Sequence, residues 1–299
     1  MKKLTKYLNP ATISKVGAYT IDPKGIVEGN IAGAHKSPFH GFSVEFAGHR
    51  EYMPGDDPKH IDWNVYYKRD KYFIKQYEAE TNLISQIFLD ASESMRFKSG
   101  DVSKLDYASY LAVTLTYLIT NARDSMGIGI FNDKIVEYLP PSNSLQMVYK
   151  MNGILEKMEP AKKTAMGNSL MDFAQRLGRR QLVIIITDCL LRPDELNDGL
   201  SRLRYDHHEV VLFHIMDPQE VDFDLHGTVR FKGMEQQGDL KMDAQRVRKA
   251  YLQKFKEHSQ KILEVCEKNR TEYVPANTGK SVAELLMSYL SSRMTHINR

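Results

Sequence analysis

The segment Ile87-Phe88-Leu89-Asp90-Ala91-Ser92-Glu93-Ser94-Met95 joins an apolar run to an acid and two hydroxyl residues. The apolar run, which begins at Ile84, is typical of a buried strand that ends at Asp90. Open α/β sheets bind ligands at the carboxyl ends of their strands, so the oxygens of Asp90, Ser92 and Ser94 would lie at such an edge. One carboxylate and two hydroxyls suit Mg²⁺ or a similar hard cation. A strand followed by a serine-rich helix cap, without any metal, would give the same local sequence.

From residue 83 onward, the chain alternates between strand and helix patterns. Strands are expected at residues 83–89, 126–131, 135–139, 181–188, 209–216 and 272–275. Helices are expected at residues 105–123, 147–158, 169–177 and 244–268, and after Pro193 and Ser281. The run Gln181–Asp188 is long and apolar without alternation, which is typical of a strand buried on both faces. Pro140-Pro141 is expected to end the strand at residues 135–139. The sequence therefore predicts an α/β fold, with a doubly wound, mostly parallel sheet and helices on both faces.

The composition, 42% hydrophobic and 26% charged over 299 residues, is ordinary for a soluble globular protein. The net charge of +3 gives no reason to expect a nucleic-acid or membrane surface. Cys189 and Cys266 lie far apart in apolar patterns and are expected to be reduced core thiols, which favours the cytoplasm. Residues 1–10 lack the apolar core of a signal peptide, and no run approaches the ~20 apolar residues of a membrane span.

Residues 1–82 differ from the rest because they are rich in glycine, proline, histidine and aromatic residues. Within them, Tyr72–Glu78 alternates like an antiparallel strand, and Pro54-Gly55-Asp56-Asp57 is a strong turn signal. We therefore expect a small β-rich lead-in module at residues 1–82 and a main α/β domain at residues 83–299. The main domain is expected to carry a hairpin insertion near residues 227–243.

Two further oxygen ligands are expected at the same sheet edge. Asp188 ends the most apolar run, and parallel strands place their carboxyl ends along one edge. The loop before the helix at residues 169–177 can start at this edge, which would bring Thr164 to it. The expected site then consists of Asp90, Ser92, Ser94, Thr164 and Asp188. Two strand-end acids that face each other without a cation would repel, which favours a bound metal.

Together these segments resemble the metal-ion-dependent adhesion site of von Willebrand factor A domains. The shared features are Asp-x-Ser-x-Ser after a strand, a Thr-x-x-Gly-x-x-Leu loop and a strand-end Thr-Asp, here at Asp90, Ser92, Ser94, Thr164, Gly167, Leu170 and Asp188. The resemblance implies that the serines contact a divalent cation directly, Thr164 directly or through water, and the aspartates mostly through waters. It implies Mg²⁺, or Mn²⁺ or Ca²⁺, with a position left open for a carboxylate of a partner protein. Cys189 departs from the family, which often has glycine there.

The lead-in module carries a second resemblance, to the signature of the bacterial domain-of-unknown-function family fifty-eight. The segments concerned are Ser43–Phe46, Arg50–Tyr52, Pro54–Pro58, Ile61–Trp63 and Tyr77–Glu80. Members of this family join such a lead-in to a von Willebrand A-like domain and are commonly partners of MoxR-type AAA+ ATPases. Many members also carry transmembrane helices ahead of the lead-in, and this sequence shows none. The motif residues are Glu45, Arg50, Tyr52, Gly55, Asp56, Asp57, Asp62, Trp63 and Glu80.

Five of the motif residues suggest how the lead-in module is held. Arg50, Asp56, Asp57, Asp62 and Trp63 are expected to form a buried network of charges and hydrogen bonds that docks the module on the main domain. A binding or catalytic surface built from the same side chains is the alternative.

The expected site contains no nucleophile or general base, so the sequence predicts a non-enzymatic, metal-dependent protein-interaction module. It would act as an adaptor of a MoxR-type ATPase and would present or recruit a client protein. The segment Asn277–Ser281 lacks the first glycine of a phosphate loop, so the chain is not expected to hydrolyse ATP. Two alternatives stay open: a metal-dependent hydrolase that adds His49, Asp56 or Asp57 to the same acids, and a structural module with a vacant metal site.

Overall fold

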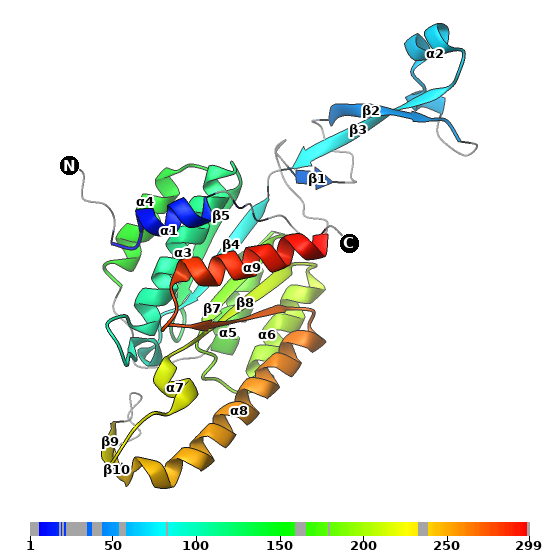
Figure 1. The fold of residues 1–299 in the computed structure, drawn as a ribbon. Coiled ribbons are helices and arrows are strands. Elements are labelled where there is room, and N and C mark those ends of the chain that lie inside the picture. Colours follow the sequence, from blue (N-terminus) through cyan, green and yellow to red (C-terminus); the bar gives the residue numbers. More distant parts are fainter. Residues whose placement is uncertain are drawn as a thin grey trace, which may run out of the picture.

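A six-stranded sheet forms the centre of the computed structural model, with helices on both of its faces (Figure 1). The structure describes residues 6–17, 19, 21, 35–37, 44–53, 58–81, 83–158, 166–178, 180–232 and 239–297. The strands of this sheet are β4 (Ile84–Asp90), β5 (Ser125–Phe131), β6 (Ile135–Ser142), β7 (Leu182–Thr187), β8 (Glu209–Met216) and β11 (Glu272–Asn277). Their order is β11-β8-β7-β4-β5-β6, and every neighbouring pair is parallel except β5 with β6. This confirms the predicted doubly wound, mostly parallel α/β fold.

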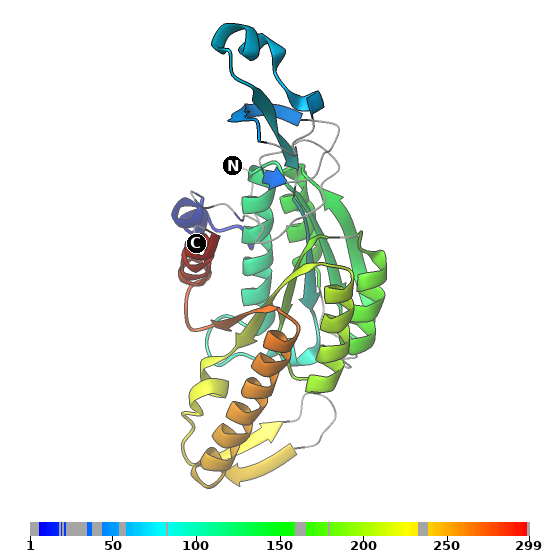
Figure 2. The same cartoon turned by 90° about the vertical axis from the view of Figure 1, so that its right-hand side faces the viewer.

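The helices divide between the two faces of the sheet. One face carries α1 (Pro10–Val16), α3 (Lys104–Asn121), α4 (Gln146–Leu155) and α9 (Val282–Ile297), and the other carries α5 (Met166–Arg176), α6 (Pro193–Tyr205) and α8 (Ala244–Lys268). Figure 2 shows the sheet between these layers. The central strand β7 explains the arrangement: Ile184 packs with the first set of helices and Ile185 with the second, and both are buried. A strand covered on both sides has no solvent face, which is why its sequence lacks alternation.

Strand β6 is one of the two edge strands of the sheet, and it extends through Pro140 and Pro141 to Ser142. The prediction that the prolines end this strand was wrong. Proline cannot donate a ladder hydrogen bond, but an edge strand has one side on which no donor is needed.

The lead-in contains a three-stranded sheet with the order β1-β3-β2. Its strands are β1 (His35–Ser37), β2 (Val44–Glu51) and β3 (Phe73–Thr81), and between β2 and β3 lie a 3₁₀ turn (Pro58–His60) and α2 (Trp63–Arg69). Figure 1 shows this arm standing away from the six-stranded sheet. The β-rich interpretation did not foresee α2, nor α1, whose Val16 and the preceding Tyr7 belong to the core of the main sheet.

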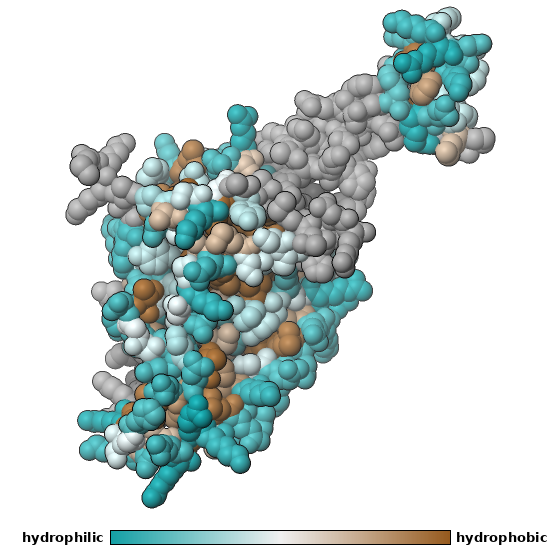
Figure 3. Space-filling model, in the orientation of Figure 1, coloured by the Kyte–Doolittle hydropathy of each residue, from teal (hydrophilic) through white to brown (hydrophobic). Residues whose placement is uncertain are grey.

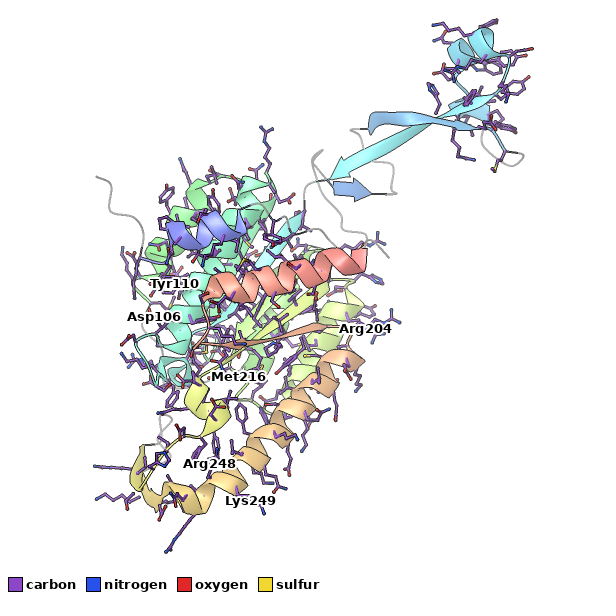
Figure 4. All side chains as sticks on the ribbon, viewed as in Figure 1. Asp106, Tyr110, Arg204, Met216, Arg248 and Lys249 are labelled. Carbon is purple, nitrogen blue, oxygen red and sulfur yellow. The ribbon has the colours of Figure 1, made fainter. Side chains whose placement is uncertain are left out.

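The expected hairpin is present as β9 (Thr228–Lys232) and β10 (Asp239–Asp243), which pair in antiparallel fashion and lead into α8. The short helix α7 (Pro218–Asp222) precedes it and was not predicted. Arg248 of α8 reaches towards α7 (Figure 4), and its guanidinium donates to the carbonyls of Asp222, at 2.9 Å, and Phe223, at 3.2 Å. The outer side of α8 is hydrophilic (Figure 3), as expected for a solvated helix face. No helix in the described ranges is long and apolar enough to span a membrane.

Gly127 in β5 has no room for a side chain. A Cβ atom there would lie 2.3 Å from Oε1 of Gln86 and 2.9 Å from the backbone oxygen of Leu139, whereas one at Gly153 in α4 would meet nothing within 4 Å. Gly127→Ala should therefore lower the free energy of unfolding by about 1–3 kcal/mol. Gly153→Ala is the matched control and should raise it by up to about 1 kcal/mol, because alanine favours the helix. Urea unfolding measures both; equal stability of Gly127→Ala and the wild type would contradict the packing described.

Candidate metal centre

Asp90 is the last residue of β4, and its side chain lies inside the protein with only 2% of the residue exposed. One carboxylate oxygen accepts a hydrogen bond from the backbone N–H of Ser92 at 2.9 Å, and the other accepts one from the Thr187 hydroxyl at 2.7 Å. Burial and, second, the negative charge of Asp188 raise the pKa of Asp90 to about 7, although both hydrogen bonds act in the opposite direction. None of the described lysine, arginine or histidine side chains forms an ion pair with Asp90.

The two serines follow Asp90 as predicted. Ser92 stands at the start of a 3₁₀ turn (Glu93–Arg96), which folds Ser94 back towards it. Their Oγ atoms are 2.9 Å apart, and both residues are buried. Each hydroxyl keeps a lone pair beyond this mutual hydrogen bond, so the pair offers two neutral oxygen ligands beside a buried carboxylate.

Asp188 follows β7, the strand that lies next to β4 in the sheet. Its Oδ2 atom is 2.8 Å from the Nζ atom of Lys104, and a second carboxylate, that of Glu220, is also 2.8 Å from Nζ. Burial lowers the pKa of Lys104, but the two carboxylates more than offset this, and its pKa lies above the ordinary value. Cys189, where the similar family often has glycine, has the left-handed backbone angle φ = 55° that glycine favours.

The structure thus brings together four of the five predicted ligands, Asp90, Ser92, Ser94 and Asp188, and Thr164 lies outside the described residues. Three residues around this group were not predicted as members of the site: Lys104 contacts Asp188, Thr187 contacts Asp90, and Glu220 contacts Lys104. Two local signals were available: Lys104 is a cation in the first turn of a helix, where acids are favoured, and Asp217 and Glu220 have capping-box spacing.

The donor set fits a hard divalent cation by its chemistry. Carboxylate and hydroxyl oxygens are the ligands of Mg²⁺ and Ca²⁺, and Asp90 is a buried negative charge without a cation among the described residues. Among the described residues, no group of three or more His, Cys, Asp or Glu side chains is arranged so that it could hold a metal ion, and the predicted ligand set has only two carboxylates. Repulsion between Asp90 and Asp188 favours a bound metal less than the sequence suggested, because the ammonium of Lys104 is a counter-charge for Asp188.

The motif residues of the arm do not dock it on the main sheet through Trp63. Trp63 is 54% exposed, and its ring contacts those of Tyr66 and Tyr72 within the arm. Asp62 caps α2 through the backbone N–H of Asn64 at 3.0 Å and lies 2.9 Å from Nε2 of His49. The docking role expected for Trp63 was therefore wrong, and its surroundings are local.

Four of the remaining motif residues lie in or directly beside two strands of the arm. Arg50 and Tyr52 lie at the end of β2, and Tyr52 contacts the ring of Tyr72. Glu45 lies in β2 and Glu80 in β3. Gly55, Asp56 and Asp57 lie outside the described residues.

His49 is excluded as a general base for the candidate centre. It pairs with Lys75 in the arm, which precedes β4, whereas Asp90 ends β4. The seven residues of β4 alone span roughly 20 Å. The hydrolase alternative therefore loses His49 as its base, and Asp56 and Asp57 lie outside the described residues.

The sheet order and the helices on both faces give this chain an α/β fold of the von Willebrand factor A-like class, and the Asp-x-Ser-x-Ser segment follows a central strand of that sheet. The chain belongs to the family described as protein of unknown function DUF58, whose model matches residues 48–261. Two relatives are uncharacterized proteins, Rv1480 of Mycobacterium tuberculosis (strain ATCC 25618 / H37Rv) and Mb1516 of Mycobacterium bovis (strain ATCC BAA-935 / AF2122/97). Each is 24% identical over 216 residues, which are 72% of this chain and 68% of the relative.

Two solved structures share the fold. The conserved hypothetical protein BatB from Bacteroides thetaiotaomicron is 18% identical, with a TM-score of 0.50 over 72% of this chain and 100% of its own. An aerotolerance-related membrane protein from Bacteroides fragilis NCTC 9343 is 17% identical, with a TM-score of 0.50 over 71% of this chain and 100% of its own. At this level of identity the likeness concerns the fold alone.

Proposed function

We propose that this chain is a non-enzymatic interaction module that holds a divalent cation and offers it to a carboxylate of a partner protein. Asp90, Ser92, Ser94 and Asp188 would hold Mg²⁺, or Mn²⁺ or Ca²⁺, with Thr164 as the fifth ligand. The observation that carries the proposal is the Ser92–Ser94 hydroxyl pair, 2.9 Å between oxygens, beside the buried carboxylate of Asp90. When bound, the cation would supply a Lewis-acidic position that a partner carboxylate can occupy.

The residues of the site would bind and orient rather than catalyse. The Thr187 hydroxyl and the Ser92 N–H fix both oxygens of Asp90, and the turn after β4 fixes the serines. Lys104 is engaged by two carboxylates, so its amine is not available as a base. Such a preorganised oxygen set suits recognition of an anion through the metal.

The partner we propose is a MoxR-type AAA+ ATPase, and the client would be a protein that the ATPase remodels. Membership of the DUF58 family supports this partnership by resemblance to members that pair with such ATPases. The chain itself has no phosphate loop of the G-x-x-x-x-G-K type, so ATP hydrolysis would be supplied by the partner.

A second candidate is a structural module whose centre works without metal. The Lys104–Asp188 ion pair favours it, because one of the two acids has its counter-charge in the protein itself. The two candidates differ in what chelation does.

Pull-down of the MoxR-type ATPase from the same genome distinguishes them. Replacing both Ser92 and Ser94 by alanine, or adding EDTA, should weaken binding on the order of tenfold or more, since even outer-shell changes cost that much at metal sites. Ser99→Ala, in an exposed position on the loop that follows, should bind like the wild type. Equal binding of the ATPase by the wild type with and without EDTA would contradict the metal-dependent function and support the structural module that works without metal.

A further inference from the structure

Lys104 is the first residue of α3, yet its side chain points into the protein and the residue is only 1% exposed. Its Nζ atom lies 2.8 Å from Asp188 and 2.8 Å from Glu220, and 5.8 Å from the centre of the Phe97 ring. A buried ammonium is costly unless it is paired, and here two carboxylates from separate elements pair with it. It therefore joins α3, the end of β7 and α7 at the candidate metal centre.

The charges around this lysine are unequal. Asp90, Asp188 and Glu220 are three carboxylates, and Lys104 is the one ammonium that the described ion pairs place among them. The ionised group carries a net charge of −2, which one divalent cation would bring to zero. Without Lys104 the same group would carry −3. A cation would then bind more tightly, but the loaded centre would keep a negative charge towards an approaching carboxylate.

We propose that Lys104 is a positioning residue that sets the cation affinity of the centre through its charge, in opposition to Glu220. This rests on the proposed metal-binding function. Lys104 repels the entering cation and competes with it for Oδ2 of Asp188, so it holds the affinity down. In return, the loaded centre is neutral, which suits a partner that offers an acidic side chain.

Isothermal titration of the metal-free protein with Mn²⁺ tests the charge rule in the wild type and four variants. Lys104→Met should bind Mn²⁺ at least tenfold more tightly than the wild type, and Glu220→Gln at least tenfold more weakly. The double variant should return to within about threefold of the wild type. Lys98→Met removes the same charge from an exposed position of the nearby loop and should leave the affinity within about twofold.

The opposite signs separate a charge effect from a structural one, because loosening of the site would weaken Mn²⁺ binding in every variant. Circular dichroism first establishes that each variant is folded. If Lys104→Met does not fold, the double variant replaces it: it must bind Mn²⁺ at least tenfold more tightly than Glu220→Gln.

Three results decide the outcome. If the wild type binds Mn²⁺ as tightly as Lys104→Met or more tightly, the inference is overturned and the proposed function stays intact. If Lys104→Met binds Mn²⁺ and the wild type does not, the inference is supported and the metal-dependent function of the wild type is overturned. Absence of binding in all of the proteins overturns both.

Discussion

In metal-free buffer at pH 8, the Asp90→Asn variant should be more stable than the wild type, and Mg²⁺ should no longer stabilise it. Asparagine has the shape of aspartate, so one oxygen can still accept from the Ser92 N–H, and the Thr187 hydroxyl can turn to accept from the amide. What is lost is a buried negative charge. The difference between the pKa of about 7 and the ordinary value of 3.8 corresponds to at most about 4 kcal/mol.

The pH dependence of this gain has a definite sign. Asp90 is a carboxyl group whose pKa is higher in the folded than in the unfolded state, so the folded state binds more protons between about pH 4 and 7. Ionisation of Asp90 therefore costs stability as the pH rises through this window. The advantage of Asp90→Asn should be small at pH 4 and largest above pH 7. Burial lowers the pKa of His214 to about 4, so this residue changes stability with pH in the opposite direction. It does so equally in the wild type and in Asp90→Asn, and its effect therefore cancels in the difference between their stabilities.

Urea unfolding at several pH values, with EDTA and with Mg²⁺, measures this prediction. Asp106→Asn is the control with the opposite sign. The side chain of Asp106 lies 2.8 Å from the ammonium of Lys6, and its pKa is lowered because the hydrogen bonds from Lys6, Tyr7 and Ser103 outweigh the effect of burial. Its replacement should reduce stability. Asp90→Asn with unchanged stabilisation by Mg²⁺ would show that Asp90 is not part of a metal centre.

Arg293→Met should lower the free energy of unfolding by about 3–5 kcal/mol. Arg293 lies in α9 and is almost fully buried, and its guanidinium pairs with Glu209 of β8 and, at 3.1 Å, with Glu272 of β11. It also donates to the Tyr289 hydroxyl at 3.1 Å. Removing it takes the ion pair with Arg293 away from two partly buried carboxylates at the β11 edge of the sheet.

Two further variants make the result specific to the ion pairs. Arg246→Met, on the exposed side of α8, should change stability by less than about 0.5 kcal/mol. Adding Glu209→Gln and Glu272→Gln to Arg293→Met should recover part of the loss, because the two partly buried negative charges that faced Arg293 are then removed as well. A loss for Arg293→Met no larger than that for Arg246→Met would mean that the buried pairs do not hold α9.

The strands and the ligand edge could be predicted because their signals are local. The apolar runs before Asp90 and Asp188 indicate both that the two strands are buried and where they end. The hydroxyls of Ser92 and Ser94 follow within four residues of Asp90. The parallel arrangement then places both acids on one edge without any further information.

The rest of the site depends on contacts between distant parts of the chain. Lys104 meets Asp188 across 84 residues and Glu220 across 116. Its place in the first turn of a helix is unusual for a cation, but it does not indicate which carboxylates the ammonium meets. The prediction that Trp63 is buried was wrong for the same reason. A lone tryptophan in an aromatic-rich stretch is expected to be buried, but the neighbours of Trp63 in the arm leave about half of it exposed. Burial is a property of the tertiary structure, and periodicity predicts it only for regular elements that cover one another.

The most direct test of a cation held by the edge of β4 and β7 is a crystal structure with Mn²⁺ that uses its anomalous scattering. We predict one strong peak in contact with the Oγ atoms of both Ser92 and Ser94, at about 2.1–2.2 Å, with Asp90 and Asp188 around it. The same crystals of the Ser92→Ala, Ser94→Ala variant should lose the peak. A wild-type crystal at saturating Mn²⁺ with no peak there, and with the Lys104–Asp188 ion pair and the Ser92–Ser94 hydrogen bond unchanged, would contradict the metal centre.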